Sequence, residues 1–105
     1  MTRSAGFIGY QLLKSFSAEG HSVKCIYALS ETTYAANVKV QRWIELRLLP
    51  EVNLAKIDLR FDAIDSLLEE ADVVMHAAAV PGLSLSWNNF ALYAACKVIG
   101  TQKLV

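Results

Sequence analysis

The sequence of 105 residues has little of what marks the specialised classes of protein. Its two cysteines, Cys25 and Cys96, are too few for a disulfide framework or a cysteine metal site. Ten basic and ten acidic residues give a net charge of zero, so no basic footprint for nucleic acid or anionic lipid is present. The apolar run 73–85 is interrupted by a histidine, a proline and a glycine and is too short to span a bilayer. We therefore expect a cytoplasmic protein with reduced thiols and without nucleic-acid or membrane partners.

The clearest local signal is a glycine turn that opens a helix near the N-terminus. Gly6 and Gly9 stand three residues apart, and a helix is predicted to run on from Tyr10 to Glu19, where Gly20 suits a left-handed end. One face of this helix carries Ile8, Leu12, Leu13 and Phe16. N–H groups at a helix start point outward, and the helix dipole adds about half a positive charge. The turn is therefore a candidate site for a phosphate group.

Strands and helices alternate through the rest of the sequence. A doubly wound parallel sheet is typical of such alternation, and the apolar run that ends in small residues at 72–78 suits its buried centre. The predicted strands are 22–28, 52–57 and 72–78, and the predicted helices are 38–49 (with Val40, Ile44 and Leu48 at helical spacing), 62–70 (capped by Asp62) and a last helix after Asn88–Asn89 (with Leu92, Cys96, Ile99 and Val105 near one face).

The sequences of four segments resemble motifs of one family, the extended short-chain dehydrogenase/reductases, also called the NAD-dependent epimerase/dehydratase family. Thr2–Gly9 resembles its T-G-x-x-G-F-I-G loop, and Asp72–Ala78 its D-V-V-x-H-x-A-A strand. Pro81–Trp87 resembles the P-G-V-x-x-S-W segment of nucleotide-sugar epimerases, and Lys97–Thr101 resembles N-V-x-G-T. The resemblance implies an α/β, Rossmann-like, doubly wound parallel sheet. Residues 1–105 would be a partial NAD(P)-binding Rossmann domain, truncated, with its first strand and C-terminal half missing.

The resemblance also implies which residues bind a cofactor, NAD or NADP. The turn would hold the pyrophosphate, the loop after the second strand the adenine, and the end of the third strand would lie under the dinucleotide. In that order these residues are Gly6, Phe7, Ile8 and Gly9; Asp58 and Leu59; and Ala77, Ala78 and Ala79. Tyr27 replaces the aspartate expected at the ribose 2′-hydroxyl, so the sequence does not choose between NAD and NADP. The substrate of a full-length relative would be a nucleotide sugar, and no metal site is implied.

Departures from the family pattern leave alternatives open. Arg3 replaces the first glycine, and either pairs with the pyrophosphate or marks a degraded site; Lys97 replaces an asparagine. The family's catalytic Tyr-x-x-x-Lys spacing occurs at Tyr10 and at Tyr93, both too early in the fold, so we expect no catalytic residues and an inactive isolated chain. The chain is then the dinucleotide-binding portion of an NAD(P)-dependent nucleotide-sugar epimerase or dehydratase. The alternative is a non-catalytic truncated remnant that binds a nucleotide weakly or only a partner chain, a second copy included.

The missing first strand carries an expectation about the sheet. In a doubly wound sheet this strand lies between those predicted at 22–28 and 72–78. Without it the two neighbours would pair directly, take a strand from another chain, or leave the chain unstable through unpaired backbone groups. For the isolated chain we favour instability, and in any ordered structure we expect direct pairing.

Overall fold

The sheet at the centre of the structure, a computed structural model, contains two parallel strands. The structure describes residues 1–28, 36–80 and 82–105. Strand β1 (Val23–Tyr27) pairs with β2 (Val52–Lys56), with Val23 opposite Val52 and Tyr27 opposite Lys56. Both strands were predicted, each within one residue of its observed ends.

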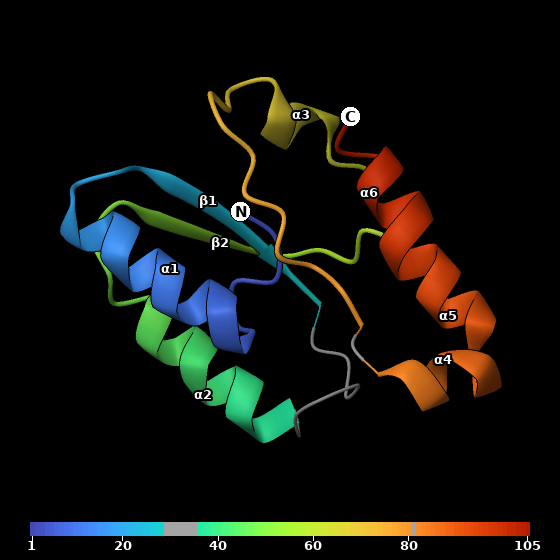
Figure 1. Cartoon of the computed structure of the whole chain (residues 1–105). Helices are drawn as coiled ribbons and strands as arrows, with labels where there is room; N and C mark the ends of the chain where they lie inside the picture. Colours follow the sequence, from blue (N-terminus) through green and yellow to red (C-terminus); the bar gives the residue numbers. More distant parts are fainter. Residues whose placement is uncertain (29–35, 81) are drawn as a thin grey trace.

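Helices cover the strands from two sides (Figure 1). The helices at 7–18 and 36–46 lie on one side, and the helix that runs from 90 to 102 lies on the other. This is the doubly wound arrangement predicted from the alternating pattern. The elements are α1 (Phe7–Ala18) and α2 (Ala36–Leu46) on the first side, α5 (Phe90–Ala94), η1 (Ala95–Ile99) and α6 (Gly100–Gln102) on the second, with the short helices α3 (Asp65–Leu68) and α4 (Leu83–Asn88) in the connections.

The first two residues lie where the first strand of such a sheet belongs. Thr2 forms parallel bridges with both Ile26 and His76. Its N–H donates to the carbonyl of Met75 at 2.9 Å, and the N–H of Ile26 donates to the carbonyl of Met1 at 2.9 Å. The expected strand order is therefore confirmed, but the expected direct pairing of the outer strands is wrong. Two residues suffice to keep the strands apart because Met1 bonds to Lys24 and Ile26 on one side and Thr2 bonds to Met75 on the other.

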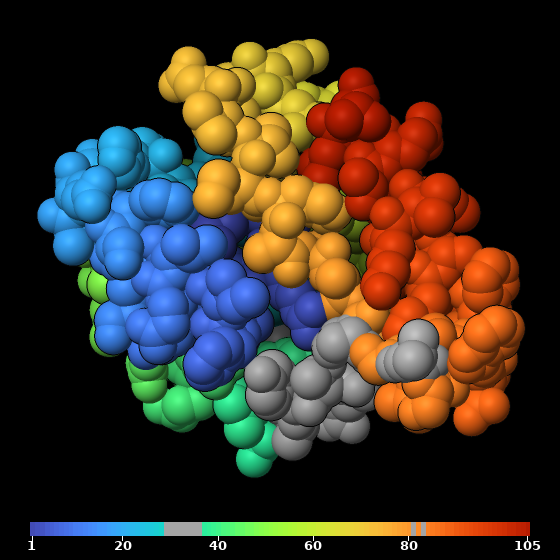
Figure 2. All heavy atoms as spheres, in the orientation of Figure 1, coloured from blue at the N-terminus to red at the C-terminus, as the bar shows by residue number. Residues whose placement is uncertain are grey.

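The predicted third strand, 72–78, is largely absent as a strand. Only the bridge at His76 remains, and residues 71–76 are exposed, with Val73 74% accessible to solvent. Figure 2 shows this segment running over the surface between α1 and the α5–α6 helix. A buried central strand was predicted from its apolar composition, but a strand needs a neighbour along its length. Met1 and Thr2 supply one at a single point.

The apolar face of α2 was also predicted incorrectly. Val40 and Ile44 are exposed, and Leu48 beyond the helix is 82% exposed. The buried side instead carries Lys39 and Leu46, and Leu46 joins Leu13 and Cys25 in the core. Both the exposed residues and the buried ones have helical spacing. Periodicity alone therefore favours the more apolar set, Val40, Ile44 and Leu48, as the buried face. In α1, Leu13 is buried as predicted but Ile8 is exposed.

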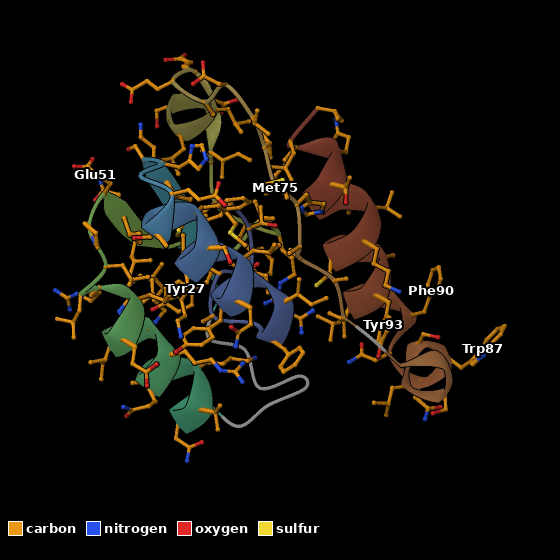
Figure 3. All side chains as sticks on the ribbon, turned by 60° about the vertical axis from the view of Figure 1, so that its left-hand side comes forward. Tyr27, Glu51, Met75, Trp87, Phe90 and Tyr93 are labelled. Carbon is orange, nitrogen blue, oxygen red and sulfur yellow. The ribbon has the colours of Figure 1, made fainter. Side chains whose placement is uncertain are left out.

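The remaining helices are shorter than predicted. Helix 62–70 reduces to α3, whose first residue follows Ile64, so Asp62 is not its cap; its carboxylate accepts from the N–H of Asp58 at 2.7 Å instead. The sequence predicts a loop at 81–87, but Leu83–Asn88 forms α4; Pro81 lies outside the described residues. Trp87 and Phe90 project from this end of the molecule (Figure 3). Among the helices in the described ranges, none has the length and apolar character needed to cross a membrane.

Candidate functional site

The glycine turn begins helix α1 as the sequence predicted. The N–H of Gly6 donates to the carbonyl of Arg3 at 3.0 Å, and the first helical bond runs from the N–H of Tyr10 to the carbonyl of Gly6 at 2.9 Å. Helical geometry leaves the N–H groups of the residues between them, Phe7, Ile8 and Gly9, without acceptors inside the helix. These three donors and the positive end of the helix dipole lie at the start of α1.

Gly9 is required by a close approach of backbone to backbone. A Cβ atom at Gly9 would lie 2.3 Å from the carbonyl oxygen of Arg3 and 3.1 Å from the Cα of Ser4. Gly6 is less tightly confined, since a Cβ there would meet mainly the side chain of Arg3, at 3.0 Å from its Cγ and 3.1 Å from its Nε. The glycine turn therefore packs against the first helical turn of α1.

Arg3 adopts the left-handed conformation that the family's glycine position suggests, with φ of 53°. A residue with a Cβ pays about 1 kcal/mol for this backbone. The side chain lies over Gly6, and its Nη1 donates to the carbonyl oxygen of Ala79. Arg3 thus connects the glycine turn to the segment that follows His76.

A cleft opens beside this connection. Its walls come from the turn, the carboxyl end of β1, the loop after β2, the segment 78–80 and the last helix. The carboxyl ends of parallel strands are where doubly wound folds bind their ligands. The lining residues are Thr2, Arg3, Ala5, Gly6, Ile26, Tyr27, Ala28, Lys39, Ile57, Asp58, Leu59, Arg60, Ala78, Ala79, Val80, Leu92 and Cys96.

The loop after β2 is fixed by an ion pair within the cleft wall. The carboxylate of Asp58 accepts from Nε of Arg60 at 2.9 and 3.1 Å, from its Nη2 at 2.5 Å and from its backbone N–H at 3.0 Å. These hydrogen bonds hold the pKa of Asp58 below its usual value and raise the pKa of Arg60. Both carboxylate oxygens are therefore engaged within the loop.

A chain of side-chain hydrogen bonds links the N-terminus to the last helix. Thr2 Oγ1 accepts from the N–H groups of Ala77 and Ala78, each at 3.0 Å, and lies 2.9 Å from Nδ1 of His76. On the other side of the ring, Nε2 lies 3.0 Å from Thr101 Oγ1, whose proton is donated to the carbonyl of Lys97 at 2.7 Å.

These directions settle how the His76 ring is protonated. Because the hydroxyl of Thr101 already donates elsewhere, Nε2 of His76 carries the proton and donates to it, and Nδ1 accepts from Thr2. Burial lowers the pKa of His76, which favours this neutral ring. The sequence favours a packed histidine, satisfied by backbone groups, over a catalytic base; His76 is instead exposed, and its two ring nitrogens bond to the hydroxyls of Thr2 and Thr101.

Five of the nine predicted cofactor residues line the cleft: Gly6, Asp58, Leu59, Ala78 and Ala79. Phe7, Ile8 and Gly9 lie at the start of α1, and Ala77 instead donates to Thr2. Sequence reasoning missed Lys39, which is 5% exposed, as well as Arg60 and Cys96. The available signal for Lys39 was its i, i+3, i+4, i+7 spacing with Arg42, Trp43 and Leu46. Two of these four residues are charged, so the set formed by Val40, Ile44 and Leu48 is the more apolar one.

The positions considered for ribose binding and for catalysis have other contacts. The ring of Tyr27 packs on that of Trp43 with 3.8 Å between centroids, and burial raises the pKa of Tyr27. The hydroxyl of Tyr10 donates to Glu45, which raises its pKa, the opposite of what a general base needs. Lys97 lies with its Nζ 5.6 Å from the ring of Tyr93, which is buried outside the cleft lining.

Known proteins match both the sequence and this geometry. The model of the NAD-dependent epimerase/dehydratase family matches residues 2–105. An uncharacterized UDP-glucose epimerase of Bacillus subtilis, YtcB, is 34% identical over 110 residues, which span the whole of this chain and 34% of the relative. UDP-glucuronic acid 4-epimerase from Bacillus cereus, solved with UDP-glucuronic acid and NAD, superposes with a TM-score of 0.89 at 30% identity over 98% of this chain and 33% of its own. MoeE5, solved with UDP-glucose and NAD, has a TM-score of 0.73 at 28% identity, over 98% of this chain and 29% of its own.

The chain spans about a third of the length of these relatives. The part matched contains the glycine turn, the parallel strands and the cleft at their carboxyl ends, which is a Rossmann-like arrangement. On the match of its residues 2–105, this chain belongs to the NAD-dependent epimerase/dehydratase family.

Proposed function

We propose that residues 1–105 form a partial dinucleotide-binding Rossmann domain, and that the cleft beside the glycine turn binds NAD. The single observation that carries the proposal is the convergence at this cleft of the glycine turn, the end of β1 and the loop after β2. Three elements far apart in the sequence meet there, at the sheet edge where this fold class binds nucleotides. NAD is preferred to NADP because the similar solved structures were determined with NAD.

Each part of the dinucleotide has a proposed place. The pyrophosphate would receive the N–H groups of Phe7, Ile8 and Gly9, with Gly6 leaving room for it. The adenine would lie against Asp58 and Leu59. Since the Asp58 carboxylate is engaged by Arg60, its role would be to hold the loop so that the backbone of Leu59 meets the ring. The dinucleotide would lie over Ala77, Ala78 and Ala79, whose small side chains allow a close approach.

The larger reaction is proposed by analogy with the relatives. In a full-length epimerase, the bound nicotinamide accepts a hydride from a sugar carbon and returns it. This chain would supply the cofactor-binding portion of such an enzyme acting on a nucleotide sugar. Neither Tyr10 nor Tyr93 lies in the cleft lining, which supports the expectation that the chain by itself has no turnover.

The rival proposal is a non-catalytic remnant that binds nucleotide weakly or only a partner chain. Its specific support is Tyr27, which stands where the ribose-binding aspartate is expected and packs on Trp43 instead. The two proposals differ in one measurable quantity, the affinity for NAD.

Calorimetric titration of the chain with NAD and with NADP tests the proposal. We expect saturable binding of NAD, stronger than that of NADP, and its loss in Gly6→Val, because a branched side chain would enter the phosphate's path and push against Arg3. Ser15→Val, on the exposed side of the same helix, is the matched control and should bind as the parent does. An affinity for NAD unchanged in Gly6→Val would show that the pyrophosphate lies elsewhere, and no binding by the parent would favour the rival.

A further inference from the structure

The ring of His76 links the first residues of the chain to the last helix. Its Nδ1 accepts the proton of the Thr2 hydroxyl at 2.9 Å, and its Nε2 donates to Thr101 Oγ1 at 3.0 Å. Thr101 in turn donates to the carbonyl of Lys97 at 2.7 Å, within the same helix. The neutral ring therefore has one acceptor and one donor, and both are used.

The hydroxyl of Thr2 also holds part of the cleft wall. Its oxygen accepts from the backbone N–H groups of Ala77 and Ala78, each at 3.0 Å. Thr2 is 2% exposed and lines the cleft, as do Ala78 and Ala79. A hydroxyl oxygen has two lone pairs and one proton. Here the lone pairs receive two N–H groups and the proton goes to His76, so the oxygen has no capacity for a further donor.

A charged His76 ring is incompatible with this arrangement. The imidazolium carries N–H on both nitrogens, so Nδ1 would change from an acceptor into a third donor directed at Thr2 Oγ1. The proton of Thr2 would lose its acceptor at the same time. Because His76 is exposed, the charged ring can turn out into water. The hydroxyl of Thr2 would then rotate toward another acceptor, and its lone pairs would turn away from Ala77 and Ala78.

The charged groups around His76 do not alter this conclusion. Burial is the cause that lowers the pKa of His76, and no charged group among the described residues contributes to it. The titratable groups on its own segment and on the two elements that it contacts are Asp72, the amino group of Met1, Arg3, Cys96, Lys97 and Lys103. The protonation of His76 is therefore governed by its burial and by its two hydroxyl partners.

We infer that His76 is a positioning residue of the proposed NAD site, and that NAD binds the chain in which the His76 ring is neutral. The neutral ring orients the hydroxyl of Thr2, and that hydroxyl fixes Ala77 and Ala78, over which the dinucleotide would lie. The inference rests on the proposed function, because it concerns the same cleft. Since binding and protonation exclude each other, bound NAD should also lower the pKa of His76.

The experiment is a titration with NAD between about pH 5 and 8, over the range in which circular dichroism shows the chain folded. The affinity should be constant above about pH 6.5, the ordinary histidine value. As the pH decreases below the pKa of His76, the affinity should fall by up to about 10-fold per pH unit, because one proton is involved. His76→Gln does not titrate, so its affinity should be independent of pH. His21→Gln, at the other histidine, which is exposed and outside the cleft lining, should behave as the parent does.

Two variants of Thr2 test the link between the ring and the cleft wall. At pH 8, Thr2→Val should lose about 10-fold in affinity for NAD, because the N–H groups of Ala77 and Ala78 lose their acceptor. Thr2→Ser retains the hydroxyl and should recover most of this loss. Proton NMR measures the pKa of His76 directly, with its ring signal identified by its absence in His76→Gln. Saturation with NAD should move that titration to lower pH.

Three results would overturn the inference and leave the proposed function in place. They are an NAD affinity that does not change with pH, the same pH dependence in His76→Gln as in the parent, and a His76 titration that NAD does not move. Equal affinities of Thr2→Val and Thr2→Ser would also contradict it. If the parent does not bind NAD at pH 8, the proposed function fails and the inference fails with it.

Discussion

Replacing Gly9 by alanine should destabilise the protein through one identifiable contact. The new Cβ would lie 2.3 Å from the carbonyl oxygen of Arg3, whereas real Cβ atoms essentially never approach a neighbour within 3.0 Å. The carbonyl must therefore move by about 0.7 Å or more. It is a backbone atom, it accepts the N–H of Gly6 at 3.0 Å, and it belongs to a residue already in the left-handed region. It has little freedom to move.

The magnitude follows from three contributions. Forcing an extra methyl group into a packed site costs about 1–3 kcal/mol, and weakening the hydrogen bond to Gly6 costs about 0.5–1.5 kcal/mol. The higher helix propensity of alanine returns up to about 1 kcal/mol. We expect a net loss of about 0.5–4.5 kcal/mol in the free energy of unfolding. In a domain of this size each kcal/mol corresponds to about 4–8 °C in the melting temperature.

Gly100→Ala is the matched control, because Gly100 is also a helical glycine. A Cβ there would lie 3.4 Å from the carbonyl oxygen of Ala95 and 3.5 Å from the Cβ of Leu59, which are ordinary contacts. The same gain in helix propensity should leave this variant as stable as the parent or more stable. Urea denaturation followed by the fluorescence of Trp43, which packs on Tyr27, measures both variants. A Gly9→Ala protein as stable as Gly100→Ala would refute the packing argument.

Two further predictions concern His76 and turnover. Burial lowers the folded-state pKa of His76, so the unfolded chain binds the proton more readily; stability should be full above about pH 6.5, the ordinary value, and should fall as the pH decreases from there toward the lower folded pKa. Urea midpoints at several pH values should show this slope in the parent and lose it in His76→Gln; an unchanged slope in the variant would assign it to another group. The chain incubated with NAD and UDP-glucuronic acid or UDP-glucose should form no epimer detectable by chromatography, since neither Tyr-x-x-x-Lys pair contributes to the cleft lining. Turnover that disappears in Tyr93→Phe would contradict this.

The local elements were the most predictable part of the fold. The glycine turn, α1, β1 and β2 follow from residues close together in the sequence: two glycines, an apolar helical period, and β-branched runs bounded by glycine and proline. Gly20, with φ of 83°, ends the first helix as its position predicted. The alternation of these elements was sufficient to predict a doubly wound sheet.

Tertiary structure decided what depends on neighbours distant in the sequence. The run 72–78 is apolar enough for a buried strand, yet its Val73 is exposed because Thr2 contacts the segment at one point. In α2 the ring of Trp43 packs on that of Tyr27 and Leu46 is buried, while Ile44 is exposed. Periodicity counts apolar residues along one helix and contains no information on which side meets the sheet.

The same distinction between local patterns and contacts of distant residues applies to the candidate site. The sequence by itself predicted the glycine turn that opens α1, and the resemblance marked residue 3 as a glycine position of the family; both concern a few consecutive backbone units. Only the tertiary structure placed the guanidinium of Arg3 against Ala79, paired Asp58 with Arg60 in the cleft wall, and gave His76 its two threonine partners. Except for the short Asp58–Arg60 pair, these contacts join residues at least 25 positions apart. Their geometry is set by how the strands and helices pack, and no local pattern specifies it.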